Sequence, residues 1–146
     1  MRVAEQLALF LENRPGRLAE ACLLLAKERI NILALSVSDT VDHGVVRLVL
    51  SDPRRAARAF SAEKIPLLTT KVVFLELDNR VGILGEIADK LATERINIEY
   101  IYATATDKQK TGCVVLRTAE PERTLQVLAA HFNGHAPREV SAKRKA

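Results

Sequence analysis

The chain has 146 residues, of which 48% are apolar and 27% charged, a balance typical of a globular protein and not of a disordered chain. Its net charge of +4 lies mostly in residues 138–146, which hold four basic side chains and one acidic one, so the rest of the chain lacks the basic face of a nucleic-acid-binding protein. No apolar run reaches the ~18 residues of a membrane span and no signal-peptide cleavage site follows the N-terminal apolar stretch, so we expect no membrane contact and a cytoplasmic location.

The first half of the chain predicts six elements in the order strand, helix, strand, strand, helix, strand. Runs rich in Val, Leu and Ile with partial alternation predict the strands. Apolar residues three and four positions apart predict the first helix, and a proline after an acidic residue predicts the start of the second. The expected elements are a strand at 6–11, a helix from the turn at 13–16 to about 29, strands at 32–38 and 45–50, a helix from 53 and a strand near 67–68.

The second half of the chain repeats the first. The 20 residues that begin at Asn79 align without a gap on the 20 that begin at Asn13, and 12 of the pairs are identical. Further on, the offset between the copies grows from 66 to 68 residues, and the two extra residues fall in a polar stretch at 106–112 that predicts a longer hairpin loop. The second copy therefore predicts strands at 72–77, 98–104, 113–117 and near 138–140, with helices from 79–82 to about 95 and from 121 onward.

This order of elements predicts an α+β protein made of two βαββαβ units. Each unit should form an antiparallel four-stranded sheet with both helices on one face. We expect the units at residues 1–70 and 71–140, followed by a basic, disordered tail at 141–146. Each unit leaves open sheet edges, so the copies should pair edge to edge in one eight-stranded sheet, and the chain should form a homodimer or a larger homo-oligomer.

Three short motifs recur in both copies. They are a turn of the form Asn-Arg-x-Gly at 13–16 and 79–82, a leucine two residues after its glycine, and Ile-Asn-Ile at the start of the second strand. These motifs resemble the ACT domain, and the resemblance covers about residues 4–140. It implies two ferredoxin-like units and a regulatory protein that binds amino acids without an attached enzyme, similar to the amino-acid-sensing domains of phosphoglycerate dehydrogenase.

The resemblance also implies where a ligand binds. In the family, the site lies where the strand-to-helix turn of one unit meets the second strand of its neighbour. We therefore expect the ligand-binding residues at the two turns and at the starts of the two second strands. They are Asn13, Arg14, Gly16, Leu18 and Asn31 in the first copy, and Asn79, Arg80, Gly82, Leu84 and Asn97 in the second.

The chemistry of these residues suits a free amino acid. Unpaired N–H groups at a helix start can bind its carboxylate, and an asparagine amide offers both a donor and an acceptor. The two asparagines of one copy lie 18 residues apart, at opposite ends of a helix of ~14 residues that spans ~21 Å. A shared ligand therefore needs the turn of one copy and the strand of the other, Asn79 with Asn31 or Asn13 with Asn97, in units paired through their second strands.

Simpler roles stay open for the same residues. Asn13 and Asn79 could cap the first helix of each copy, and Asn31 and Asn97 could adopt a left-handed conformation after it. The two turn glycines could serve only to let helix pack on sheet. Tyr100 and Tyr102 alternate, so they share one side of a strand, where they could line a pocket or cover the open face of the sheet.

The sequence contains no catalytic or metal-binding pattern, so we expect no enzyme, no cofactor and no metal. His43, His131 and His135 lack metal-ligand spacing, and Cys22 and Cys113 are too far apart for a zinc motif. Two other functions stay open. One is a structural or protein-interaction module without a ligand. The other is RNA binding, which the absence of aromatic residues from both third strands argues against.

Overall fold

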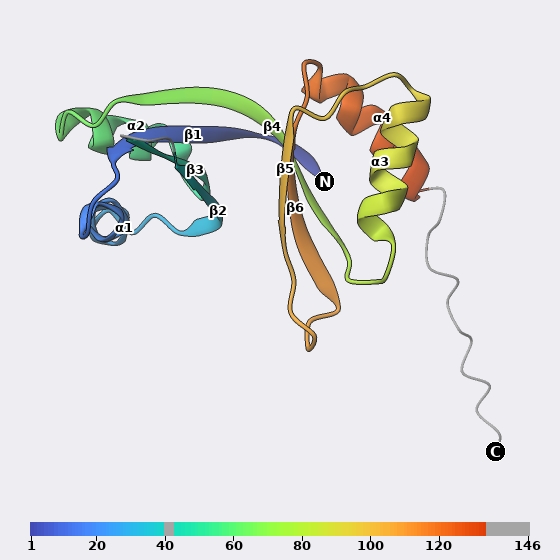
Figure 1. Cartoon of the computed structure of the whole chain (residues 1–146), viewed down its shortest axis with the longest axis horizontal. Helices are drawn as coiled ribbons and strands as arrows, with labels where there is room; N and C mark the ends of the chain where they lie inside the picture. Colours follow the sequence, from blue (N-terminus) through green and yellow to red (C-terminus); the bar gives the residue numbers. More distant parts are fainter. Residues whose placement is uncertain (40–42, 134–146) are drawn as a thin grey trace.

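The structure is a computed structural model of the chain, and it describes residues 1–39 and 43–133. Within these residues the chain forms six strands and four helices (Figure 1). The elements are β1 (Arg2–Glu12), α1 (Arg17–Lys27), β2 (Ile32–Asp39), β3 (His43–Leu50), α2 (Pro53–Ala62), β4 (Leu67–Asp78), α3 (Ile83–Thr93), β5 (Tyr100–Thr104), β6 (Thr111–Arg117) and α4 (Pro121–Asn133). The predicted helices and strands occur in the predicted order within these residues, except that the strands expected near 67–68 and at 72–77 form one strand, β4.

All six strands join in one antiparallel sheet with the order β2-β3-β1-β4-β6-β5. The two long central strands serve both copies. Residues 67–70 of β4 pair with β1 and complete the first copy, whereas residues 73–78 pair with β6 in the second. Residues 2–5 of β1 pair with residues 71–74 of β4 and supply the second copy with its fourth strand. The α+β class and the two ferredoxin-like units are confirmed.

The predicted eight-stranded sheet and the pairing through second strands are wrong within the chain. No turn residue separates the last strand of the first copy from the first strand of the second, so both merge into β4, and the 70/71 boundary lies inside it. As a result, β2 and β5 lie at opposite edges of the sheet. The strand expected near 138–140 and the tail at 141–146 lie outside the described residues, and residues 2–5 occupy the place beside β4 where we expected that strand.

Three apolar cores hold the molecule together. Helices α1 and α2 cover one half of the sheet around Leu9 and Phe60, and α3 and α4 cover the other half around Leu75 and Leu128 (Figure 1). The third core joins the faces of the sheet that carry no helix. It consists of Ala4, Ala34, Val49, Val72, Phe74 and Val115. The two halves therefore fold onto each other and place β2 against β5 across the open face.

A buried polar cluster lies between the halves. Gln6 of β1 is 0% exposed, and its Nε2 donates to the hydroxyls of Tyr100, at 2.6 Å, and Thr70, at 3.2 Å. Its Oε1 accepts from the Tyr102 hydroxyl at 2.8 Å, and the Arg47 guanidinium lies 4.4 Å from the centre of the Tyr100 ring. Tyr102 packs on the third core and also lines a cavity between β2 and β5, so it both covers the open sheet face and lines a pocket.

Candidate functional site

The Asn-Arg-x-Gly turns have the same backbone in both copies. Gly16 and Gly82 are the N-cap residues of α1 and α3, with φ of 91° and 88°, in the left-handed region that favours glycine. No heavy atom would lie within 4 Å of a Cβ at either position, so the conformation requires glycine and the packing does not. Neither helix has a side-chain cap, so the alternative that Asn13 and Asn79 cap these helices is wrong, and both lie in the turn before the N-cap glycine. Their first turns can offer N–H groups to a ligand.

The turn of the second copy opens onto a cavity of about 400 Å³, which we call the α3 cavity. It lies between this turn, the first turn of α3, the end of β5 and the start of β6. Four of the predicted ligand-binding residues line it, namely Asn79, Arg80, Gly82 and Leu84. Its other lining residues are Leu77, Asp78, Ile83, Gly85, Ala103, Thr104, Ala105, Gly112, Cys113 and Val114.

Asn79 ties the turn to the loop between β5 and β6. Its side-chain Nδ2 donates to the carbonyls of Thr106, at 2.9 Å, and Gln109, at 3.2 Å, and its backbone N–H donates to Lys110 at 2.8 Å. Both hydrogens of the Asn79 side-chain amide therefore bond to the loop, and the side-chain oxygen is the group that can accept a hydrogen bond from a ligand. The hairpin that carries the two extra residues of the second copy thus holds one wall of the α3 cavity in place.

The α3 cavity has one charged rim and a largely apolar wall. Arg80 at the rim forms an ion pair with Glu86, which also lies 2.8 Å from His131 Nε2. Hydrogen bonds from Arg80 and then His131 hold the pKa of the Glu86 carboxyl below its ordinary value. Inside, burial and then the charge of Glu76 raise the pKa of Cys113, which favours its neutral thiol. The arrangement suits a carboxylate at the rim and an apolar group within.

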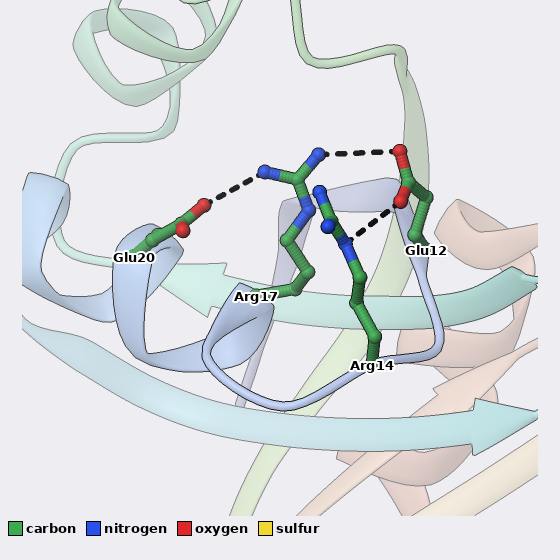
Figure 2. Close-up of polar contacts among 4 residues, drawn as sticks. All are labelled: Glu12, Arg14, Arg17 and Glu20. Carbon is green, nitrogen blue, oxygen red and sulfur yellow. Dashed lines mark hydrogen bonds and ion pairs between the residues drawn. The ribbon is translucent and has the colours of Figure 1, made fainter.

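Ion pairs surround the turn of the first copy. Arg14 Nε lies 2.8 Å from Glu12, and Arg17 bonds to Glu12 at 3.3 Å and to Glu20 at 2.8 Å (Figure 2). The second copy has Ile83 where the first has Arg17. The remaining predicted residues of this turn, Asn13, Gly16 and Leu18, are exposed.

The asparagines at the second strands lie apart from the α3 cavity. Asn31 and Asn97 are exposed, and neither lines it. The left-handed residues after α1 and α3 are Arg29, with φ of 55°, and Arg95, with φ of 58°, so the prediction that asparagines hold this conformation is wrong. Asn31 instead exchanges hydrogen bonds with Ser51, which accepts from its N–H at 2.9 Å and donates to its carbonyl at 3.0 Å.

The α3 cavity nevertheless reaches the seam between the copies. A second cavity of about 150 Å³ lies between Ala34, Leu35 and Ser36 of β2 and the end of β5. Three residues line both cavities, namely Ala103, Thr104 and Cys113. None of these three wall residues was predicted from the sequence to bind a ligand. Only the longer loop after β5 signalled that the second copy differs here.

Residues 1–134 match the family of ACT domain pairs. The chain belongs to this family. The ACT domain pair has the same fold as protein BT0572 from Bacteroides thetaiotaomicron, with a TM-score of 0.82, 35% identity and 89% of each chain covered. A search of curated proteins found no significant match.

Two further structures share the fold at lower identity. One is the ligand-free regulatory subunit of aspartate kinase from Thermus thermophilus, with a TM-score of 0.63, 17% identity, and coverage of 90% of this ACT domain pair and 98% of that chain. The other is the regulatory subunit of aspartate kinase from Thermus flavus, with a TM-score of 0.58, 19% identity, and coverage of 90% and 97%.

Metal and membrane features are absent from the part of the chain that the structure describes. There, no three His, Cys, Asp or Glu side chains gather as a metal site would require. Among the same residues, no helix combines the length and the apolar character needed to cross a bilayer.

Proposed function

We propose that this ACT domain pair is a non-catalytic, cytoplasmic sensor that binds a free amino acid in the α3 cavity. One observation carries the proposal. A cavity of about 400 Å³ lies at the N-terminus of α3, which has no side-chain cap. It is lined by three residues of the Asn-Arg-x-Gly motif, Asn79, Arg80 and Gly82, and by the leucine that follows the motif, Leu84. A cavity of this size, with apolar walls and a few polar groups, is typical of small-molecule sites.

The cavity offers a partner to each part of an amino acid. The carboxylate binds the N–H groups of the first turn of α3, where the helix dipole is positive, and the Arg80 guanidinium. The amide oxygen of Asn79 accepts from the ammonium. The side chain of the ligand packs against Leu77, Ile83 and Val114. Neutral Cys113 adds no charge to this wall.

A partner chain in a homo-oligomer completes the site. The edge strands β2 and β5 have one unpaired side each within the described sheet, and both carry exposed apolar residues, Leu35 and Val37 on β2 and Ile101 on β5. Such edges pair with other strands. In a homo-oligomer formed through them, Asn31 or Asn97 of one chain meets a turn of another. The first-copy turn, with Asn13, Arg14, Gly16 and Leu18, has the same design and can form an equivalent site.

Ligand binding transmits a signal by raising the fraction of chains that are paired with a partner chain. A ligand that contacts two chains favours the paired form over the separate chains, and it can shift this equilibrium only by its difference in affinity for the two forms. The neighbouring structures are named as regulatory subunits of aspartate kinase, which supports a role in controlling another protein.

A melting-temperature screen tests the proposed function. The twenty amino acids are each added to the full chain, with common nucleotides as controls. We expect one amino acid, or a chemically related group, to raise the melting temperature, because a ligand that binds only the folded state stabilises it by mass action. A screen in which no amino acid raises the melting temperature contradicts the proposal and favours a protein-interaction module without a ligand.

A further inference from the structure

A third cavity, of about 740 Å³, opens on the helix side of the first copy. It lies between α1 and the segment that joins α2 to β4, and we call it the helix-gap cavity. Apolar side chains of Phe10, Leu11, Leu24 and Ile65 form much of its wall. Its volume falls within the range of about 300–1,000 Å³ that is usual for ligand sites.

In the second copy a side-chain contact bridges the corresponding gap, and a cavity of about 420 Å³ remains beside it, lined by Lys90 and His131 among others. There α4 continues to Asn133, about one turn beyond the point that matches the end of α2 at Ala62. His131 of this extra turn bonds to Glu86 of α3 at 2.8 Å, and Phe132 packs on the core of the second copy. The first copy has neither the histidine nor the phenylalanine that form these contacts, since Glu63 and Lys64 stand at the matching positions.

The matching residues of the first copy cannot form the same bridge. Glu20 corresponds to Glu86 and Glu63 corresponds to His131, so two carboxylates line the gap where the second copy has a carboxylate and an imidazole. Like charges repel each other, and Lys64 replaces the apolar Phe132. The chain also leaves helical geometry here, since Lys64 has a φ of 57°. The gap between α1 and the α2–β4 segment consequently stays open.

Charged groups of both signs stand around this opening. Arg17 bonds to Glu12 and Glu20, while its Nε is buried without an acceptor (Figure 2). Glu63 and Lys64 also line the cavity, and within residues 1–39 and 43–133 their side chains have no hydrogen bond or ion pair. A carboxylate and an ammonium without partners among the described residues thus line the same cavity as these apolar side chains.

We propose that the helix-gap cavity is a second ligand site, which takes a zwitterionic amino acid with a large apolar side chain. The ligand carboxylate binds Lys64 and Arg17, its ammonium binds Glu63, and its side chain packs against Phe10, Leu24 and Ile65. This site rests on the proposed function and adds a binding place in the first copy, away from the residues of its Asn-Arg-x-Gly turn. It involves none of the residues that line the α3 cavity, so either site can fail without the other.

An NMR titration of the full chain with L-phenylalanine tests the proposal. We expect saturable shifts in the side-chain methyls of Leu24 and Ile65 and in the amides of residues 63–65. Shifts at residues 79–85 report separately on the α3 cavity, so one titration distinguishes the two sites. No response of the helix-gap residues at about 10 mM L-phenylalanine overturns this proposal, whatever happens at the α3 cavity.

Two analogues test whether the site recognises a zwitterion. 2-Phenylethylamine lacks the carboxylate and 3-phenylpropanoate lacks the ammonium. We expect each to bind the helix-gap cavity at least about tenfold more weakly than L-phenylalanine, since each leaves one charged partner without its counterpart. Equal affinity for all three compounds would show a merely apolar pocket and contradict the proposal.

Two variants locate the binding. Leu24→Trp fills the cavity and Glu63→Lys reverses the charge that receives the ammonium, so we expect both to lose the shifts at residues 63–65. Ala26→Trp places the same indole on an exposed position of α1 outside the cavity and should bind like the original chain. Glu63 is exposed, so its replacement remains informative if Leu24→Trp fails to fold. Unchanged binding by Glu63→Lys refutes the assignment.

Discussion

Asn79 and Asn13 occupy the same position of the repeated motif, but only Asn79 has a side chain bonded to another segment. Its amide donates to two carbonyls of the β5–β6 loop, whereas the Asn13 side chain forms no hydrogen bond within the described residues. The loop that Asn79 contacts is two residues longer than its counterpart in the first copy. The pair therefore gives a matched test of what the motif asparagine does.

Replacing Asn79 by Ala should destabilise the chain by about 1–2 kcal/mol, since two hydrogen bonds to the loop are lost. Amide exchange at residues 106–110 should accelerate, and the rise in melting temperature with the amino acid should disappear. Urea denaturation and hydrogen exchange measure these effects. Asn13→Ala is the control and should change the stability by less than about 0.5 kcal/mol. Equal effects of the two replacements would contradict the role given to Asn79.

The sequence predicted the turn glycines and the motif residues but not their partners. The glycines could be found because a repeated Asn-Arg-x-Gly pattern has few local conformations. The contacts of Asn79 could not, because Thr106 and Gln109 lie 27 and 30 residues away in the chain. The cap prediction failed because Gly16 and Gly82 take the N-cap place themselves.

At the scale of elements, the joining of two strands decides the topology. The sequence predicted separate strands near 67–68 and at 72–77, but no turn residue lies between them, and they form the single strand β4. The other elements predicted within the described residues were correct, whereas the pairing of the copies was not. Strand pairing depends on contacts between distant segments, here between residues 2–9 of β1 and residues 67–74 of β4. A local pattern does not contain that information.

Replacing Gln6 by Leu should cost about 2–4 kcal/mol, because the partly buried hydroxyls of Tyr100 and Tyr102 lose their partner. Urea denaturation measures the loss. The same replacement in a Tyr102→Phe background should lower the stability by a smaller amount, since the Tyr102 hydroxyl that would lose its partner is then absent. Gln126→Leu, at an exposed position of α4, is the control and should have little effect. Strictly additive losses would contradict the coupling of β1 to β5.

At the scale of the whole molecule, neither copy is complete without the other. The first needs residues 67–70 of β4, and the second needs residues 2–5 of β1. The third core adds apolar contacts between the open faces of the sheet. The two copies should consequently unfold together in one cooperative transition.

Deleting residues 1–5 should therefore damage the second copy more than the first. Residues 71–74 of β4 lose their partner strand, while residues 6–12 keep their pairing with β3. We expect a lower melting temperature and faster amide exchange in β4, β6 and α3 than in β3 and α1. Hydrogen exchange resolved by residue measures the difference. Uniform protection in both halves would contradict the shared-strand account.

An NMR titration with the amino acid that most raises the melting temperature tests the α3 site most directly. Gly85 lines the cavity, and a Cβ at this position would have no heavy atom within 4 Å, so Gly85→Leu should fill the space. Ala19→Leu introduces the same side chain at the matching position of the first copy and is the control. We predict that the amides of residues 79–85 and 103–105 shift in the original chain and in Ala19→Leu, but not in Gly85→Leu. Shifts that persist unchanged in Gly85→Leu, or that never occur at these residues, would contradict an amino-acid site in the α3 cavity.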